Sequence, residues 1–149
     1  MLTRPTTDQV LGALARDLEE VVLPAVTDEP VRVAIGMMVQ LARGCAERAA
    51  HEIAWMYEEM AAIEAATTDI DDGQTHAALL AFRRAPADSM HLADVVARYH
   101  LASEALGAAL EWAYRGGHHD RATALRDLLF ARSAHEMQIV GALDLVGRG

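Results

Sequence analysis

One long stretch without proline limits the possible folds of this chain more than any other feature. From Val31 to about Ala66 no proline occurs, and apolar residues recur at steps of three and four, which is the pattern of an amphipathic helix. At 1.5 Å per residue such a helix is about 54 Å long. Its predicted apolar stripe consists of Ala34, Met38, Leu41, Cys45, Ala49, Met56, Met60 and Ile63. We expect this stripe to be buried.

Four more helices are predicted around the long one, at about 6–23, 71–84, 88–115 and 120–146. The first begins with the capping-box spacing of Thr6 and Gln9, and Pro24 is expected to end it, because proline removes a donor and disfavours helix before it. Thr27 or Asp28 is suited to cap the long helix. Gly116-Gly117 predicts a tight turn between the last two helices, which would then lie side by side.

The composition agrees with this pattern of helices. Of the 149 residues 30 are alanine and only 5% are aromatic, a composition typical of helix packing rather than of a sheet. A chain of this length forms one domain more readily than two. We therefore predict an all-α fold, an antiparallel helical bundle of three long and two short helices, as a single domain over residues 1–149.

The charge of the chain excludes some classes of partner. There are 22 acidic and 13 basic residues, which gives a net charge of −9, whereas nucleic acids and anionic membranes require clustered positive charge. No apolar run reaches the roughly 18 residues of a membrane span, and no apolar signal region follows the N-terminus. Cys45 is the only cysteine, so no internal disulfide can form. We expect a cytoplasmic protein that binds neither nucleic acid nor membrane.

Several polar residues interrupt the apolar stripes and are the candidate site. If Gly117 marks the turn, positions equally distant from it on the last two helices lie at the same level. The candidate polar layer consists of Glu52, His100, Ser103, Arg132, His135 and Glu136. The spacing also predicts pairing of Arg132 with Glu136 and of Arg48 with Glu52. Two interpretations stay open, a structural network that fixes helix register and a ligand pocket in the bundle core.

Metal chemistry and covalent catalysis find less support in the sequence. The Glu-x-x-His repeat of di-iron bundles is absent, although Glu47/His51 and His100/Glu104 each place two potential ligands on one helix face. Cys45 is expected to be buried and unreactive among apolar neighbours. No glycine-rich phosphate loop or hydrolase motif occurs. We expect no metal, no cofactor and no catalytic residue, and favour a protein that is not an enzyme.

The N-terminal third resembles an uncharacterised bacterial family of helical proteins. The resemblance is carried by Arg4-Pro5, by the segment Val-Leu-Pro-Ala-Val at 22–26, and by the apolar spacing of 32–43. Members of that family are small cytoplasmic proteins, often encoded beside aminoglycoside-phosphotransferase-like kinases and acyl-CoA dehydrogenases. The chain departs from the family pattern at Gly36 and Gly44. The resemblance implies an accessory role near such enzymes and supplies no catalytic residue.

Three hypotheses for the function follow from these observations. The first is a non-catalytic accessory protein that forms a homodimer or docks to a metabolic enzyme through the long second helix, whose apolar surface exceeds what short neighbours can cover. The second is a bundle that binds a small apolar ligand of acyl type in a methionine-lined cavity. The third is a metal-dependent bundle enzyme.

Overall fold

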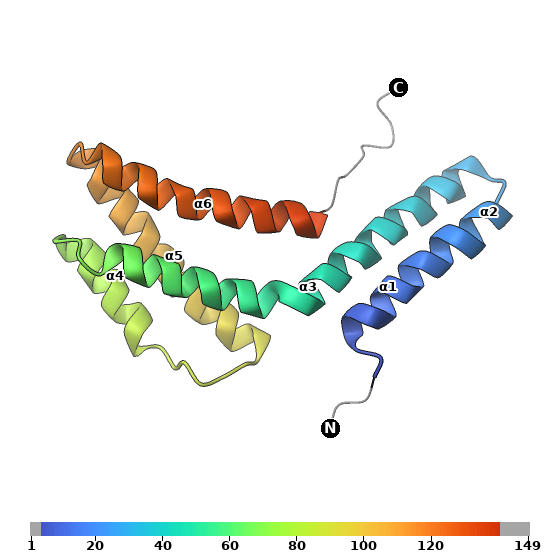
Figure 1. Ribbon diagram of the computed structural model, residues 1–149, viewed down its shortest axis with the longest axis horizontal. Helices are drawn as coiled ribbons and strands as arrows, with labels where there is room; N and C mark the ends of the chain where they lie inside the picture. The colour runs from blue at the N-terminus through green and yellow to red at the C-terminus, as the bar shows by residue number, and fades with distance from the viewer. Residues whose placement is uncertain (1–3, 141–149) are drawn as a thin grey trace. The chain divides into compact units, whose positions relative to one another are not determined.

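The computed structural model describes residues 4–140, and every regular element in that range is a helix (Figure 1). The elements are α1 (Thr7–Asp17), the π-helical segment η1 (Leu18–Val22), α2 (Leu23–Ala25), α3 (Glu29–Thr67), α4 (Gly73–Arg84), α5 (Leu92–Arg115) and α6 (His119–Val140). The prediction of an all-α helical bundle is confirmed. The predicted end of the last helix, at Val146, lies outside the described residues.

The helices group into two compact units, which are described separately. Within the described range, unit 1 comprises residues 4–52 and 134–140, and unit 2 comprises residues 53–133. Both α3 and α6 therefore contribute one part to each unit.

Short polar side chains set the starts of several helices, as the sequence predicts. The Thr6 amide donates to the side-chain oxygen of Gln9 at 3.1 Å, one half of a capping box. Asp28 accepts from the amide of Val31 at 3.1 Å before α3. The boundaries of α3 follow the expected ones closely, whereas α5 begins at Leu92, later than predicted.

The expected helix end at Pro24 is wrong. The helix continues through a π-helical turn at 18–22 into α2, which contains Pro24 and ends at Ala25. The amide of Leu23 bonds back to the carbonyl of Leu18, five residues earlier. A wider turn of this kind gives the proline ring room beside the carbonyl of the preceding turn, with which it would clash in a regular α-helix.

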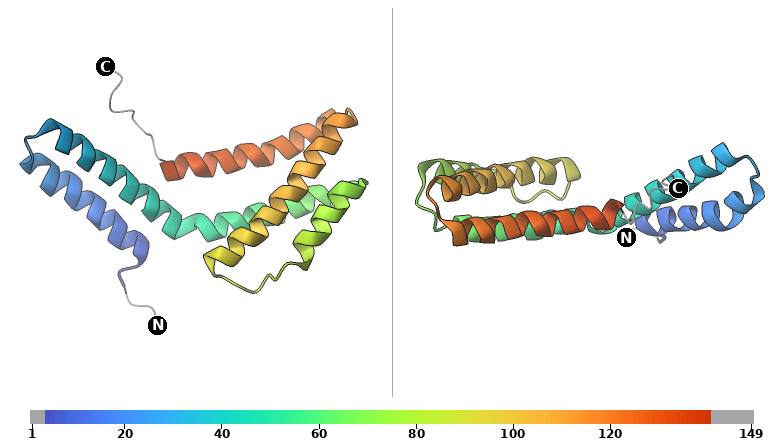
Figure 2. Two further views of the ribbon diagram at one scale, coloured as in Figure 1. Left: turned by 180° about the vertical axis from the view of Figure 1, so that it is seen from behind. Right: turned by 90° about the horizontal axis from the view of Figure 1, so that it is seen from above.

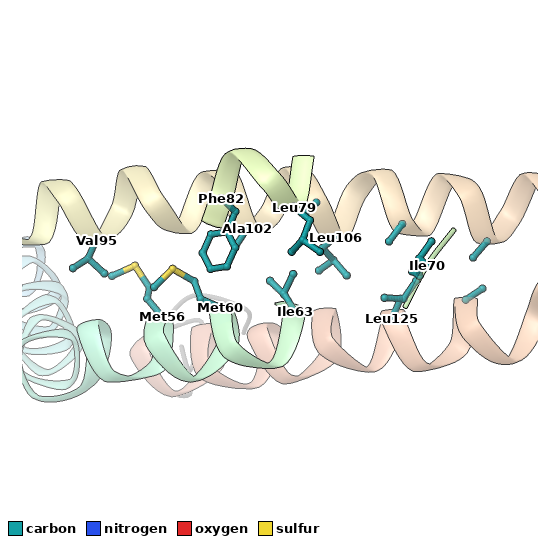
Figure 3. Packing of buried hydrophobic residues seen from close by; sticks show 14 residues of the cluster. Met56, Met60, Ile63, Ile70, Leu79, Phe82, Val95, Ala102, Leu106 and Leu125 are labelled. Atoms are coloured by element: carbon teal, nitrogen blue, oxygen red, sulfur yellow. The ribbon is translucent and has the colours of Figure 1, made fainter. Parts of the chain in front are cut away.

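Unit 2 holds the larger hydrophobic core. It is built from the second part of α3 together with α4, α5 and the first part of α6. The two methionines in the second part of α3, Met56 and Met60, lie beside Val95 and Phe82 (Figure 3). The face of α5 toward this core is rich in alanine, which allows its neighbours to approach closely.

The turn between α5 and α6 has the geometry that two glycines allow. Gly117 has a φ of +67°, and the amide of His118 bonds to the carbonyl of Ala113 at 2.9 Å. The amide of Gly117 bonds to the carbonyl of Tyr114 at 3.3 Å. Together these two bonds form a Schellman motif, which ends a helix with a left-handed residue. The predicted hairpin of the last two helices is thus present, with α5 and α6 antiparallel.

Unit 1 is a helical hairpin in which α1 to α2 run antiparallel to the first part of α3 (Figures 1 and 2). Its core is small, with four buried apolar residues, Ala15, Ile35, Val39 and Ala42. The turn is held by Arg32, whose Nη1 donates to the carbonyls of Leu23 and Val26 at 2.9 and 3.0 Å.

The end of α6 approaches α3 closely in the same unit. A Cβ at Gly44 would lie 2.7 Å from the carbonyl oxygen of Ile139. Real Cβ atoms essentially never come so close to an oxygen, so only glycine permits this approach. The sequence indicates a bend or a close helix contact at Gly36 and Gly44, and the structure places a close contact at Gly44 alone, since nothing lies within 4 Å of a Cβ at Gly36.

Candidate functional site

Two of the six candidate layer residues meet in unit 2. Arg132 of α6 donates from Nη2 to the hydroxyl oxygen of Ser103 on α5 at 3.0 Å, and from Nε to Oε1 of Glu59 on α3 at 2.7 Å. Tyr99, one turn before Ser103, donates its hydroxyl to Oε2 of Glu59 at 2.8 Å. The guanidinium carbon of Arg132 lies 4.9 Å from the centre of the Tyr99 ring. We call these four residues the Arg132 network.

The Arg132 network connects three helices of unit 2 through a nearly buried carboxylate. The side chain of Glu59 is 9% exposed and that of Arg132 is 30% exposed. Each oxygen of the carboxylate accepts a hydrogen bond, so its charge is compensated where burial alone would be costly. The hydroxyl of Ser103 accepts from the cationic Arg132, and the two oxygens of the Glu59 carboxylate accept from Arg132 and Tyr99, an arrangement that does not activate Ser103 as a nucleophile. The chemistry of the network is that of a fixed support between helices.

The sequence does not identify Glu59 and Tyr99 as members of this layer. The predicted partner of Arg132 is Glu136, on the same helix, but the structure gives it Glu59, and Glu136 is exposed. A signal for Glu59 existed, because it follows Glu52 by seven residues and so lies near the same face of α3. The prediction stopped at the earlier of the two glutamates.

The other four predicted layer residues are divided between the two units. His100 is exposed on α5. Glu52, His135 and Glu136 belong to unit 1, where Glu52 pairs with Arg48 at an N–O distance of 3.7 Å, as the spacing predicts. The side chain of Arg48 is about half exposed, so this pair contributes little to stability. Residues 4–140 contain no group of three or more His, Cys, Asp or Glu side chains placed to hold a metal ion.

A second feature emerges in unit 1, where part of the predicted apolar stripe of α3 is uncovered. In unit 2 its members Met56, Met60 and Ile63 are buried, as expected. In unit 1 the buried residues of α3 belong to a neighbouring face, and Met38 and Leu41 are 54% and 67% exposed. The expectation of a wholly buried stripe is therefore wrong for its first half. Cys45 lies in that half and is exposed, contrary to the prediction.

The cause of this difference is the apolar character of α3 on more than one side. Between Arg32 and Arg43 the chain carries no charged residue, so either of two faces could be buried. The face with Ile35 and Val39 packs on α1, and the face with Met38 is left open. Periodicity alone does not distinguish the two, because both repeat at helical spacing.

The partner helix of the hairpin also carries exposed apolar residues. On α1, Val10 and Leu14 are each 49% exposed. At about 100° per residue, Leu14 and Val10 lie roughly 100° and 140° around the helix from the buried Ala15. On α3, the exposed stripe with Met38 and Leu41 is likewise rotated away from the buried face with Ile35. The angle is about the same, and the sense of rotation is the same when each helix is viewed from its own N-terminus.

Because the two helices are antiparallel, two exposed stripes that are rotated in the same sense away from their buried faces lie on the same side of the hairpin. The ion pair between Glu19 and Arg43 supports this geometry, since both residues are displaced in the opposite sense and meet on the opposite side. The open side consists of Val10, Leu14, Val31, Ala34, Met38, Leu41 and Cys45. We call this surface the hairpin face.

The comparisons with known proteins add no assignment. None of the helices within residues 4–140 combines the length and the apolar character needed to cross a membrane. No family model matches the chain, and searches of curated proteins and of solved structures find no match either.

Proposed function

We propose that this protein is a non-catalytic accessory protein of the cytoplasm that acts by binding another helical surface through its hairpin face. The observation that carries the proposal is the exposure of Met38 and Leu41 in the middle of an uncharged helical stretch. A helix that is apolar on all sides is normally buried, and α1 covers only one side of this one.

The extent of the exposed surface supports a binding role. Scattered apolar residues are normal on protein surfaces, but a contiguous apolar patch of more than a few hundred Å² is rare on a monomer. The hairpin face brings exposed Val, Leu and Met side chains of two adjacent helices to one side of the hairpin. Methionine adapts its shape readily, which suits a surface that receives a partner.

The Arg132 network supports the same proposal indirectly. An acyl-binding pocket closed by a polar layer would require Arg132 to offer its donors to a ligand. Its Nε and Nη2 instead donate to Glu59 and Ser103. The methionines expected to line such a pocket, Met56 and Met60, are packed in the core of unit 2 (Figure 3).

Two kinds of partner fit a surface of this type. One is a second copy of the chain. The other is a metabolic enzyme of the acyl-CoA or phosphotransferase-like kind that the resemblance of the N-terminal third suggests. Both would cover the same residues of the hairpin face, so the function can be tested before the partner is known.

Photo-cross-linking from single positions of the full chain tests the function in the source cell. A photoreactive amino acid replaces Leu41 on the hairpin face or, as the control, Val33, which is exposed on another side of the same helix. We expect one reproducible adduct from position 41, identified by mass spectrometry as a second copy or as a single other protein, and none from position 33. No adduct from position 41, or equal adducts from both positions, would contradict the proposal.

A further inference from the structure

We infer that the partner covering the hairpin face is a second copy of this chain, so that two hairpins pack face to face as a four-helix bundle. This inference rests on the proposed function and specifies its partner. Three observations carry it: the spacing of the exposed residues, the small core of unit 1, and the size of the hairpin face.

The spacing of the exposed residues on α3 indicates a helical partner. Val31, Ala34, Met38, Leu41 and Cys45 follow one another at steps of three, four, three and four. This is the heptad spacing with which helices pack side by side in bundles and coiled coils. In the part of the chain that the structure describes, the hairpin face itself is a helical surface with this spacing and no cover.

The small core of unit 1 indicates that the partner is present whenever the hairpin is folded. Among the described residues, four buried apolar residues, two of them alanine, and the partly buried Leu18, Leu23 and Val26 form the cluster between the two helices. A pair of helices with so little buried surface gains little from packing, whereas a bundle of four encloses a core of its own.

The size of the hairpin face is that of a homodimer interface. Its Val, Leu and Met side chains are about half exposed or more. Together with the exposed small residues between them, they offer several hundred Å² of apolar surface, near the about 800 Å² per partner of a standard interface. Homodimer interfaces are also the more apolar class, in keeping with the absence of charged residues between Arg32 and Arg43.

The net charge gives this dimer a distinctive response to salt. Each chain carries a charge of −9, so two copies repel one another at a distance. Salt screens that repulsion, with a Debye length of about 30 Å at 0.01 M and about 8 Å at 0.15 M. The apolar contact itself is not weakened by salt. The dimer should therefore become tighter as sodium chloride is added, whereas a complex steered by opposite charges becomes weaker.

Sedimentation equilibrium of the purified full chain tests the inference. We expect twice the mass of one chain at micromolar concentration, and a dissociation constant that falls when the salt is raised from about 0.01 to about 0.15 M. Leu41→Glu should weaken the dimer by at least about 100-fold, because a charge would be buried in the interface without a partner. Val33→Glu adds the same charge to another side of the same helix and should leave the dimer within about threefold of the unmodified chain.

A third variant keeps the test valid if Leu41→Glu fails to fold. Leu41→Ala retains an apolar residue of high helix propensity and should weaken the dimer by about 10-fold or more without loss of helical circular dichroism. A monomer for the unmodified chain at all concentrations, or equal dimer strength in the position 41 and position 33 variants, would overturn the inference. A monomer that still cross-links from position 41 to a different identified protein would overturn the dimer and leave the proposed function standing.

Discussion

Arg132 on α6 and Glu59 on α3 are 73 positions apart in the sequence and are joined by a hydrogen bond of 2.7 Å from Nε to Oε1. Within unit 2, the bond fixes the position of α6 along the length of α3. Tyr99 and Ser103 attach α5 to the same pair. A bundle held by apolar contacts alone tolerates sliding of its helices, and a buried charged pair with defined geometry opposes such sliding.

Replacing Glu59 by Gln should destabilise unit 2 by about 1–3 kcal/mol, because the guanidinium of Arg132 and the hydroxyl of Tyr99 lose a charged acceptor in a half-buried position. Chemical denaturation followed by circular dichroism measures the change. Glu58→Gln, at an exposed neighbouring position, is the matched control and should shift the free energy of unfolding by less than about 0.5 kcal/mol. Equal effects of the two variants would contradict the role given to the Arg132 network.

Gly117→Ala should destabilise the protein by about 1–2 kcal/mol, since its φ of +67° lies in the left-handed region where a side chain is strained. Gly107→Ala is the control on the same helical hairpin. It lies inside α5 with nothing within 4 Å of an added Cβ, so alanine there should raise stability by about 0.5–1 kcal/mol. Thermal unfolding of the two variants should thus shift in opposite directions.

Gly44→Ala should loosen the end of α6 in unit 1. The added Cβ would meet the carbonyl oxygen of Ile139 at 2.7 Å, and backbone cannot yield as a long side chain can. Hydrogen exchange of residues 134–140 is the measurement, and faster exchange is the expected result. Gly36→Ala, on the same helix with open space at the Cβ, should leave that exchange unchanged. Unchanged exchange in both variants would show that the contact does not hold α6.

The helices and their caps could be predicted from the sequence because their signals are local. Gln9, Asp28 and Gly117 act on amides and dihedral angles within a few residues of themselves. The prediction that Pro24 ends the helix is wrong because the effect of a proline depends on whether the preceding turn can widen. The π-helical segment is such a widened turn. A rule for a regular α-helix does not cover that case.

The candidate layer could be predicted only in part because it depends on which helix faces meet. The level of Ser103 against Arg132 follows from counting outward from one turn, and the structure joins these two residues. The contact of Glu59 with these two residues cannot be predicted in this way, because no turn near Glu59 fixes its level relative to α5 and α6. For the same reason the sequence does not predict that Ile35 rather than Met38 is buried. Both faces of that stretch are apolar, and the position of the partner helix decides which of them is covered.

Asp72 makes the stability of α4 depend on pH in the acid range. Its carboxylate accepts hydrogen bonds from the amide and the hydroxyl of Thr75, both at 2.9 Å, and these bonds lower the pKa of Asp72 below its ordinary value of 3.8. A lowered pKa in the folded state means that the carboxylate stabilises the fold at pH values above the unfolded pKa. That stabilisation is lost as the pH falls through the folded pKa.

Asp72→Asn should therefore be less stable than the unmodified chain at pH 6. The difference should begin to shrink as the pH falls below the unfolded pKa, and it should vanish only below the lowered folded pKa of Asp72, where both chains carry an uncharged cap. Urea denaturation at pH 6 and at pH 3 measures the two differences. Asp71→Asn, at the preceding exposed position, controls for the change in net charge and should show no such convergence. A difference between Asp72→Asn and the unmodified chain that is equal at both pH values would show that the charge of Asp72 adds nothing to its hydrogen bonds with Thr75.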